Sequence, residues 1–444
     1  MGCQSPYDWR VSGHGIEAEL HLKGISHRSL GIAAFSTIVE WYDFTLYLYF
    51  ATVLSRVFYG GGSVSLLTTL GGFAIAYLMR PLGAVYFGHI GDRIGRRHML
   101  LLSVALMTAA MLATALLPTF SQVGAAAGWL LFLLRCVMGF SVGGEYTGVV
   151  AYLLEGAPAR KRGLIASLAS AASEIGALLA VAVSALTVAL LDEASLQSWG
   201  WRIPFLFGAA LAGTVWIARS NMEESPEFHR QKAAGSVPDN PLRHSLGNHR
   251  AAIGRAFAIS ALGSITYYVG ITYVPAFLTS AGSLSEQTSL TLSTAAAVIV
   301  ILVTPFVGAL SDLVGRKPVL AGLSLANMLL PITMFSLMAS GSQSNALAGA
   351  LVLAALAGGV SAVGAVATAE QFPGEGRVTG LALGATGATA IFGGLTPFLA
   401  QYLVERTGFA IVPGVMIAVV SLSVLPLFLT MTETAPNVSK AKKI

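Results

Sequence analysis

The chain has 444 residues, of which 55% are hydrophobic and only 11% are charged, with a mean hydropathy of +0.72. Because soluble globular proteins carry about 25% charged residues, this composition excludes a protein built from soluble domains. The net charge of +5 does not indicate nucleic-acid binding, since the basic residues follow a membrane topology. Cys3 and Cys136 are the only cysteines, so no disulfide framework or zinc site is expected.

Apolar runs long enough to cross a bilayer recur along the whole chain. A bilayer core requires about 20 apolar residues per helix, and backbone in lipid must satisfy its own hydrogen bonds. We therefore predict an all-α polytopic membrane protein with twelve transmembrane helices. The predicted spans are 30–57, 64–87, 98–117, 126–154, 164–190, 201–219, 254–280, 288–308, 318–338, 345–369, 379–403 and 409–431.

The polar segment from Ser220 to Arg250 is the longest in the chain and separates spans six and seven. It divides the chain into two halves of six helices each. We predict a tail (1–29), a six-helix bundle (30–219), a linker (220–253), a second six-helix bundle (254–431) and a second tail (432–444). The first tail has no apolar core, so it is not expected to be a signal peptide.

The basic residues predict the orientation of the chain in the membrane. If the N-terminus is cytoplasmic, 21 of the 26 Lys and Arg residues lie in cytoplasmic segments. Only Arg56 and Arg406 then lie on the outer side. Since cytoplasmic loops are enriched in Lys and Arg, we predict that both termini are cytoplasmic.

A short charged loop motif occurs twice, at an offset of 220 residues. GHIGDRIGRR occupies 88–97, and GALSDLVGRK occupies 308–317. The shared positions are Gly88, Asp92, Gly95 and Arg96 in the first copy and Gly308, Asp312, Gly315 and Arg316 in the second. The first copy also contains Arg93 and Arg97. A repeat at half the chain length predicts two copies of one structural unit.

A second motif, E-x-x-P-x-x-x-R, recurs at an offset of 215 residues. Its copies contain Glu155 and Arg162, and Glu370 and Arg377. Asp92 could cap a helix, and Arg96 or Arg97 could pair with Glu155. These contacts would latch the cytoplasmic face, and Asp312, Arg316 and Glu370 would do the same in the second half. In the alternative interpretation, the loop charges only set the topology.

Ionisable residues within the spans are costly and are candidates for function. Glu40 and Asp43 lie three residues apart in span one and share a helix face. They could bind a ligand or a proton, or could only hold the bundle together. Glu174 lies among small residues in span five and could carry a proton.

Span four contains Arg135 near the membrane midplane and Glu145 closer to the cytoplasm. A guanidinium there requires an anion. That anion could be Glu40, Asp43 or Glu174, or a substrate carboxylate. The alternative for Arg135 is a permanent ion pair, and Glu145 could equally be structural.

Span seven contains Tyr267, Tyr268 and Tyr273, which could bind a polar ligand or serve only in packing. Glycines in span four favour close helix packing. Gly393, Gly394, Pro397 and Pro305 mark possible helix breaks. The sequence GFSVG at 139–143 matches a hydrolase motif, but it lies within a helix and no histidine is expected within reach. We therefore expect no catalytic site, no cofactor and no metal.

Seven stretches resemble the major facilitator superfamily and, more narrowly, its metabolite:proton symporter family. They are VEWYDF (39–44), RPLGAVYFGHIGDRIGRR (80–97), GFSVGGEYTG (139–148), WGWRIPF (199–205), ESPEF (224–228), GALSDLVGRKP (308–318) and AIFGGLTP (390–397). Members of this family include permeases for α-ketoglutarate, citrate, shikimate and proline/betaine. The resemblance implies two bundles with alternating access and proton-driven uptake across a bacterial inner membrane.

The same resemblance implies that Glu40, Asp43, Arg135 and Glu145 lie near the site or its coupling network. Leu313 replaces the arginine of the first loop motif, which implies a weaker second latch. The chain ends soon after Lys443, without the long coiled-coil tail of osmosensing members, so osmotic gating is not expected. Glu174 matches no family signature, and its role rests on the residues alone.

The sequence predicts proton-coupled uptake of a small organic acid, with Arg135 attracting the anion. Glu40 or Asp43, with or without Glu174, would bind the proton. The first alternative is a symporter of a zwitterionic osmolyte such as proline or betaine, whose ammonium would contact aromatic rings. A membrane receptor and a drug exporter are further alternatives. A monomer, with only substrate, protons and lipid as partners, is expected.

Overall fold

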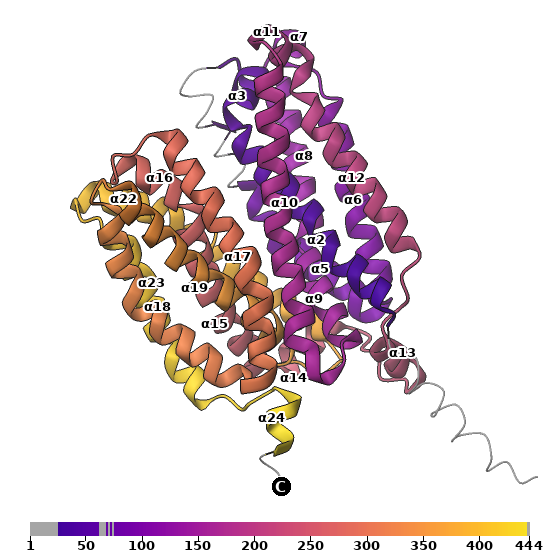
Figure 1. Cartoon of the computed structure of the whole chain (residues 1–444). Helices are drawn as coiled ribbons and strands as arrows, with labels where there is room; N and C mark the ends of the chain where they lie inside the picture. Colours follow the sequence, from indigo (N-terminus) through magenta and orange to yellow (C-terminus); the bar gives the residue numbers. More distant parts are fainter. Residues whose placement is uncertain (1–24, 62–67, 70–71, 73–74, 442–444) are drawn as a thin grey trace, which may run out of the picture.

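The computed structural model describes residues 25–61, 68–69, 72 and 75–441. Within these residues the chain is helical and has no β-strand. The helices form two bundles that lie side by side (Figure 1). The predicted all-α fold of two six-helix bundles is confirmed. Residues 1–24, parts of the predicted second span, and Lys442 and Lys443 lie outside the described residues.

The N-terminal bundle contains the first six spans. Span one is divided between two helices at Phe50, and span four is divided at Gly143 and Gly144. The helices are α2 (His27–Tyr49), α3 (Ala51–Tyr59), α5 (Met79–Arg93), α6 (Arg96–Ala115), α8 (Ala126–Val142), α9 (Glu145–Gly156), α10 (Arg162–Leu190) and α12 (Arg202–Ser220).

The C-terminal bundle contains the other six spans. Spans seven and eleven are each built from several segments, and the others are single helices. The segments are α15 (Arg250–Tyr267), η3 (Tyr268–Thr272), α16 (Val274–Ser280), α17 (Glu286–Val314), α18 (Arg316–Met338), α19 (Gln343–Ala369), α20 (Arg377–Leu381), η4 (Ala382–Thr386), α21 (Gly387–Phe392), α22 (Thr396–Thr407) and α23 (Val412–Thr430).

Most spans meet a simple test of length and hydropathy. Nine helical segments among the described residues are long and apolar enough to cross a membrane, and the bent pair Arg250–Thr272 and Val274–Ser280 makes a tenth. The other two are span one, which is interrupted at Phe50, and span two, which lies partly outside the described residues.

Helix breaks were predicted in spans eleven and eight, and the structure has only the first of them. Span eleven breaks between Phe392 and Thr396, where Gly393 and Gly394 lie, as predicted. Pro305 lies inside the continuous helix α17, so that break is not found. A proline can remain within a transmembrane helix because neighbouring groups satisfy the freed backbone carbonyl.

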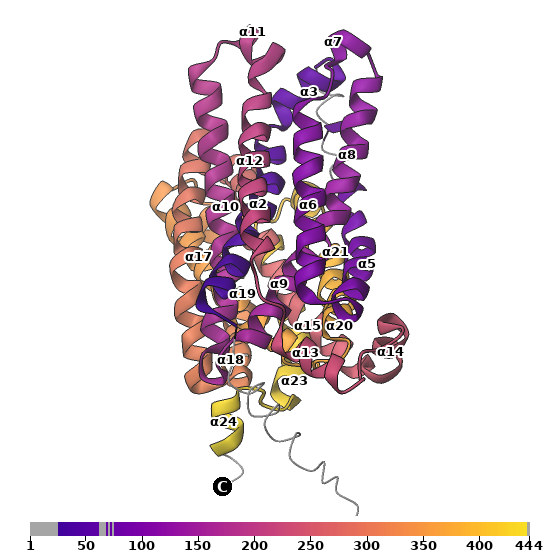
Figure 2. The same ribbon diagram turned by 90° about the vertical axis from the view of Figure 1, so that its right-hand side faces the viewer.

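One end of the molecule carries the linker helices and both loop motifs, and we call it the linker face. There α13 (Pro226–Ala233), α14 (Pro241–Asn248) and α24 (Pro436–Ala441) lie beneath the bundles (Figure 2). The opposite end, the far face, carries α7 (Phe120–Val123) and α11 (Glu193–Ser195). The bundles lie closest at the linker face and diverge towards the far face (Figure 1).

Candidate functional site

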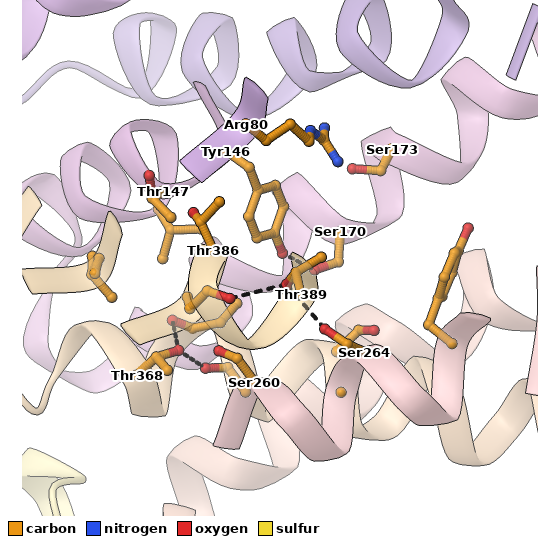
Figure 3. A pocket seen from close by; sticks show the side chains of 18 of the residues that line it. Arg80, Tyr146, Thr147, Ser170, Ser173, Ser260, Ser264, Thr368, Thr386 and Thr389 are labelled. Atoms are coloured by element: carbon orange, nitrogen blue, oxygen red, sulfur yellow. Dashed lines mark hydrogen bonds between the residues drawn. The ribbon is translucent and has the colours of Figure 1, made fainter. Parts of the chain in front are cut away.

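A cavity of about 190 Å³ lies between the two bundles, and we call it the central cavity. Hydroxyl-bearing side chains of both bundles surround it, with Tyr146 and Ser170 on one side and Ser264 and Thr389 on the other (Figure 3). Its polar and aromatic lining residues are Glu40, Trp41, Tyr77, Arg80, Tyr146, Thr147, Ser170, Ser173, Glu174, Ser260, Ser264, Tyr267, Tyr268, Ser361, Thr368, Thr386 and Thr389.

Arg80 is the only basic residue lining the central cavity among the described residues. Its Nη2 donates a hydrogen bond to Glu40 Oε1, and its Nη1 donates to the hydroxyl of Tyr77 at 3.1 Å. Its guanidinium also lies over the ring of Tyr77, 4.9 Å from the ring centre. Arg80 was not among the predicted site residues, although it is the only charged residue in a long apolar run.

Glycines determine how closely the helix carrying Arg80 packs in the bundle. A Cβ atom at Gly139 would meet the carbonyl oxygen of Ala76, and one at Gly143 would meet the backbone of Arg80. The predicted close packing of span four is therefore confirmed. It places α5 directly against α8, so that Arg80 lies beside α2 and its Glu40.

Glu174 also lines the central cavity, as part of α10. It is 3% exposed, and the hydroxyl of Tyr267 in the other bundle donates to its Oε1 at 2.5 Å. Within the described part of the chain it forms no ion pair. Tyr77 and Tyr268 make a second hydrogen bond between the bundles, with 2.6 Å between their hydroxyl oxygens.

Asp43 and Arg135 lie outside the central cavity and pair with each other. Arg135 Nη1 donates to both carboxylate oxygens of Asp43, at 2.8 and 3.1 Å, and Nη2 donates to Thr114 Oγ1 at 3.1 Å. Both residues line a smaller cavity of about 40 Å³, shared with Glu40 and Arg80. The geometry therefore favours the permanent ion pair for Arg135 over direct contact with substrate.

Two further predicted residues also lie away from the central cavity. Glu145 pairs with Arg219 and accepts a hydrogen bond from Ser103, all three being buried. Tyr273 donates to Gln401 Oε1 at 2.7 Å. Of the eight predicted binding or coupling residues, the structure brings four to the central cavity: Glu40, Glu174, Tyr267 and Tyr268.

At the linker face, each motif aspartate caps a helix of the opposite bundle. Asp92 accepts hydrogen bonds from the backbone N–H groups of Val378 and Thr379, at 3.2 and 2.8 Å. Asp312 accepts from those of Gly163 and Leu164, at 2.8 and 3.0 Å. A carboxylate at a helix N-terminus is favoured by the unpaired N–H groups and by the helix dipole.

The motif arginines pair within their own bundles. Arg96 contacts Asp92 at 3.3 Å and Glu155 at 3.1 Å. Arg316 contacts Asp312 at 2.9 Å and Glu370 at 3.2 Å. The predicted pairing of Glu155 is therefore with Arg96 and not with Arg97, whose Nη2 donates to the carbonyl of Ser220.

One ion pair joins the two bundles directly at this face. Arg377 Nη1 lies 2.9 Å from Glu155 Oε1. Its counterpart in the repeat, Arg162, makes no ion pair within the described ranges. Arg93 is exposed and makes no such pair there either.

The motif glycines are required by backbone shape and by close approach. Gly95 and Gly315 have φ angles of 133° and 112°, which favour glycine. A Cβ atom at Gly88 would lie 3.0 Å from the backbone of Thr379 in the other bundle. These positions therefore permit the sharp loop and the contact between bundles.

Two carboxylates that were not predicted as site residues complete this network. Glu224 accepts hydrogen bonds from the backbone N–H groups of Arg96 and Arg97, and Glu433 accepts from those of Arg316 and Lys317. Both follow the last helix of their bundle, so the network has the two-fold repeat of the sequence. The sequence contains a third repeated pattern that could have indicated them: ESP follows span six, and ETAP follows span twelve.

The fold and the cavity between the bundles, with its buried charged residues, define the class of protein: a multi-pass membrane transporter. A model of sugar (and other) transporters matches residues 30–240, and one of the major facilitator superfamily matches residues 256–444. The xylose:proton symporter XylE has a similar structure, with a TM-score of 0.74, 20% identity, and coverage of 92% of this chain and 96% of XylE.

Sequence relatives define the family more narrowly. The ectoine/proline transporter ProP of Corynebacterium glutamicum is 32% identical, over 89% of this chain and 82% of its own. The α-ketoglutarate permease of Escherichia coli K12 is 33% identical, over 84% and 86%. The citrate-proton symporter of Klebsiella pneumoniae is 30% identical, over 85% of each. The chain belongs to the major facilitator superfamily and, within it, to the metabolite:proton symporter family.

Proposed function

We propose that this transporter is a proton-coupled symporter that takes up a small zwitterionic solute by alternating access. The observation that carries this proposal is the charge balance of the central cavity. Its ionisable acidic residues are Glu40 and Glu174, and Arg80 is its one basic residue within the described part of the chain. We therefore put a zwitterion, which the sequence analysis gave as the alternative, ahead of an organic acid as the substrate.

The charge balance disfavours an anion with several carboxylates. Arg80 is already neutralised by Glu40, so each added negative charge would lie in a cavity with no further cation. A zwitterion adds no net charge. Its carboxylate can lie near Arg80, and its ammonium can lie near a carboxylate or over the rings of Trp41 and Tyr267.

Glu174 is the residue that we propose to carry the proton. A buried carboxyl without a cation favours its neutral form. The one hydrogen bond described for the Glu174 side chain comes from the hydroxyl of Tyr267. Because Tyr267 belongs to the opposite bundle, gain or loss of the proton acts on a contact that must change when the bundles move. This links protonation to alternating access.

The linker face acts as the gate that alternates with the far face. The caps made by Asp92 and Asp312 join the bundles on this side. We propose that the linker face is cytoplasmic, as the basic residues predict, that the membrane is a bacterial inner membrane, and that the transporter works as a monomer. Substrate and proton would then enter from the far face and leave where these contacts separate.

Symport of an organic acid is the second candidate function. It is favoured by the likeness to the α-ketoglutarate permease and the citrate-proton symporter. In that case the anion would take Arg80 in place of Glu40, and Glu40 would have to be protonated. Arg80, rather than Arg135, would then attract the anion.

The test is uptake into proteoliposomes that contain the purified full chain, with and without an imposed proton gradient. We expect proline to accumulate only with the gradient, and the Glu174→Gln variant to exchange proline without gradient-driven accumulation. Accumulation of α-ketoglutarate instead would establish the second candidate. Accumulation of substrate to the same level with and without the proton gradient would contradict proton coupling altogether.

A further inference from the structure

Two neighbouring residues in the wall of the central cavity each have a buried polar atom without a partner among the described residues. They are the Nε1 of Trp41 and the Oε2 of Glu40. Buried polar groups are nearly always hydrogen-bonded, and leaving one unpaired is costly. Because both residues line the central cavity, these two atoms are available to a ligand bound there.

The two atoms have complementary chemistry. An indole Nε1–H can only donate, and an ionised carboxylate can only accept. Both belong to α2 and line the same cavity, and the other oxygen of Glu40 already accepts from Arg80. The pair thus offers one donor and one acceptor to a single small ligand.

The position of Trp41 is fixed by its surroundings. Its ring makes edge-to-face contacts with Phe44 and with Tyr267 of the other bundle, at 5.5 and 5.4 Å between ring centres. Such contacts hold a ring in one orientation. The indole N–H is therefore a preorganised donor rather than a mobile one.

We propose that Trp41 and Glu40 form a substrate subsite that selects a zwitterion whose ammonium still carries at least one hydrogen. Trp41 donates to the substrate carboxylate, next to Arg80. Glu40 Oε2 accepts a hydrogen bond from the substrate ammonium. This inference rests on the proposed zwitterion symport and narrows its substrate class. A fully N-methylated ammonium has no hydrogen for Glu40 and leaves that atom unpaired.

The first experiment measures equilibrium binding to the purified full chain for glycine and its mono-, di- and trimethylated forms. We expect N,N-dimethylglycine to bind at least about tenfold more tightly than the trimethyl compound, because only the former can donate to Glu40. Equal or tighter binding of the trimethyl compound would overturn the acceptor half of the proposal. It would mean that aromatic rings, and not Glu40, recognise the ammonium.

The second experiment compares Trp41→Phe with Trp216→Phe, using proline and its carboxamide as ligands. Phenylalanine keeps a ring beside Tyr267 but removes the N–H, whereas Trp216 is exposed on α12, away from the cavity. We expect Trp41→Phe to weaken proline binding about tenfold or more, to affect the carboxamide much less, and to leave the pH dependence of uptake unchanged. Unaltered proline binding would overturn the donor half.

These assays separate the subsite from the proposed function. Equilibrium binding does not require proton coupling, so failure of gradient-driven uptake leaves the methylation series informative. If carboxylic acids bind and none of the zwitterions does, the proposed function fails, and the subsite fails with it. If proline accumulates with the gradient but glycine and its N-methylated forms all bind with the same affinity, only the proposed subsite is wrong.

Discussion

Arg80 is half-buried and Arg135 is buried in the N-terminal bundle, and their partners give them different roles. Arg80 has one carboxylate partner and a tyrosine hydroxyl at the edge of the central cavity. Arg135 has both oxygens of Asp43, the hydroxyl of Thr114, and the rings of Tyr47 and Phe205 around its guanidinium. A substrate can therefore compete for Arg80, whereas Arg135 is held by the protein itself.

Replacing Arg135 is expected to affect stability before it affects binding. Arg135→Ala leaves Asp43 buried without its cation, which costs about 3–5 kcal/mol of unfolding free energy. The double variant Asp43→Leu/Arg135→Met should recover most of that loss, since a buried ion pair can often be replaced by apolar packing. Thermal unfolding in detergent measures both. If Arg135→Ala unfolds like the native protein yet no longer binds substrate, Arg135 belongs to the binding site.

Replacing Arg80 is expected to weaken substrate binding as well as stability. Arg80→Gln removes the one cation of the central cavity among the described residues and should weaken substrate binding by about tenfold or more. It also leaves the buried Glu40 without its cation, so the unfolding temperature should fall too. Arg56→Gln is the matched control, because Arg56 also pairs with a glutamate, Glu193, but does so at an exposed position. Binding isotherms of both variants, with proline as ligand, test this. Equal affinities would remove Arg80 from the site.

At the scale of the helices, the contact between α5 and α8 determines where Arg80 lies. Gly139 lies on α8 and Gly143 at its C-cap, four residues apart, so they present one small face to α5 and to Ala76 just before it. The C-terminal bundle has a corresponding contact, since a Cβ atom at Gly358 of α19 would lie 3.3 Å from the backbone of Val300 on α17. Spans seven and eleven of that bundle are in addition bent or broken near the cavity.

A methyl group at this contact is expected to disturb both packing and binding. In Gly143→Ala the new Cβ meets the backbone of Arg80 and of Ala84, and such overpacking costs about 1–3 kcal/mol. Gly213→Ala on α12 is the control, because its Cβ would have no neighbour within 4 Å. Unfolding temperature and substrate affinity should fall together in Gly143→Ala only. If Gly143→Ala keeps the native unfolding temperature and affinity, α5 and α8 can move apart without loss of stability.

At the scale of the whole molecule, the linker-face network repeats but is not symmetric. Asp92 and Asp312 each cap a helix of the other bundle, and Arg96 and Arg316 each bind their own pair of carboxylates. The ion pair between bundles occurs once, from Arg377 to Glu155. Arg96 Nη2 also donates to the carbonyl of Gly374 in the other bundle, at 2.9 Å. The half of the network built around Asp92 therefore has two more contacts to break.

Weakening the network is expected to open the linker face. Asp92→Asn removes the negative charge that accepts hydrogen bonds from the backbone N–H groups of Val378 and Thr379. The equilibrium constant for opening of the linker face should therefore rise by up to about tenfold. We also expect slower turnover with only a modest change in substrate affinity. The measurement is labelling of Thr368→Cys, in the central cavity, by a membrane-impermeant thiol reagent added at the linker face.

The labelling experiment has a natural background and a matched control. Cys3 and Cys136 are the only cysteines to be replaced. Asp192→Asn changes the residue before α11 at the far face and should not alter the labelling rate. Asp312→Asn should have an effect similar to that of Asp92→Asn. If substrate binding collapses while exchange stays fast, these aspartates do not form a gate.

The sequence by itself determined the twelve spans, their division into two halves, and the two copies of the loop motif. Span length and hydropathy are set by the thickness of the bilayer, and the repeat preserves its spacing. That Glu155 pairs with an arginine of the first loop motif could also be predicted, because the residues lie near helix ends on one side of the membrane, but the choice between Arg96 and Arg97 could not. Glu40, Glu174, Tyr267 and Tyr268 were found because polar groups in an apolar run are costly.

Only the tertiary structure decided which of the buried charges face the cavity. Whether Arg135 meets Asp43 or a ligand depends on the rotation of α8 against α2, which no local pattern contains. Arg80 was overlooked although it lies within the predicted second span, because the sequence does not show that it meets Glu40 of the first span. The caps on Val378 and Gly163 join residues more than a hundred positions apart, and such contacts exist only once the bundles are packed.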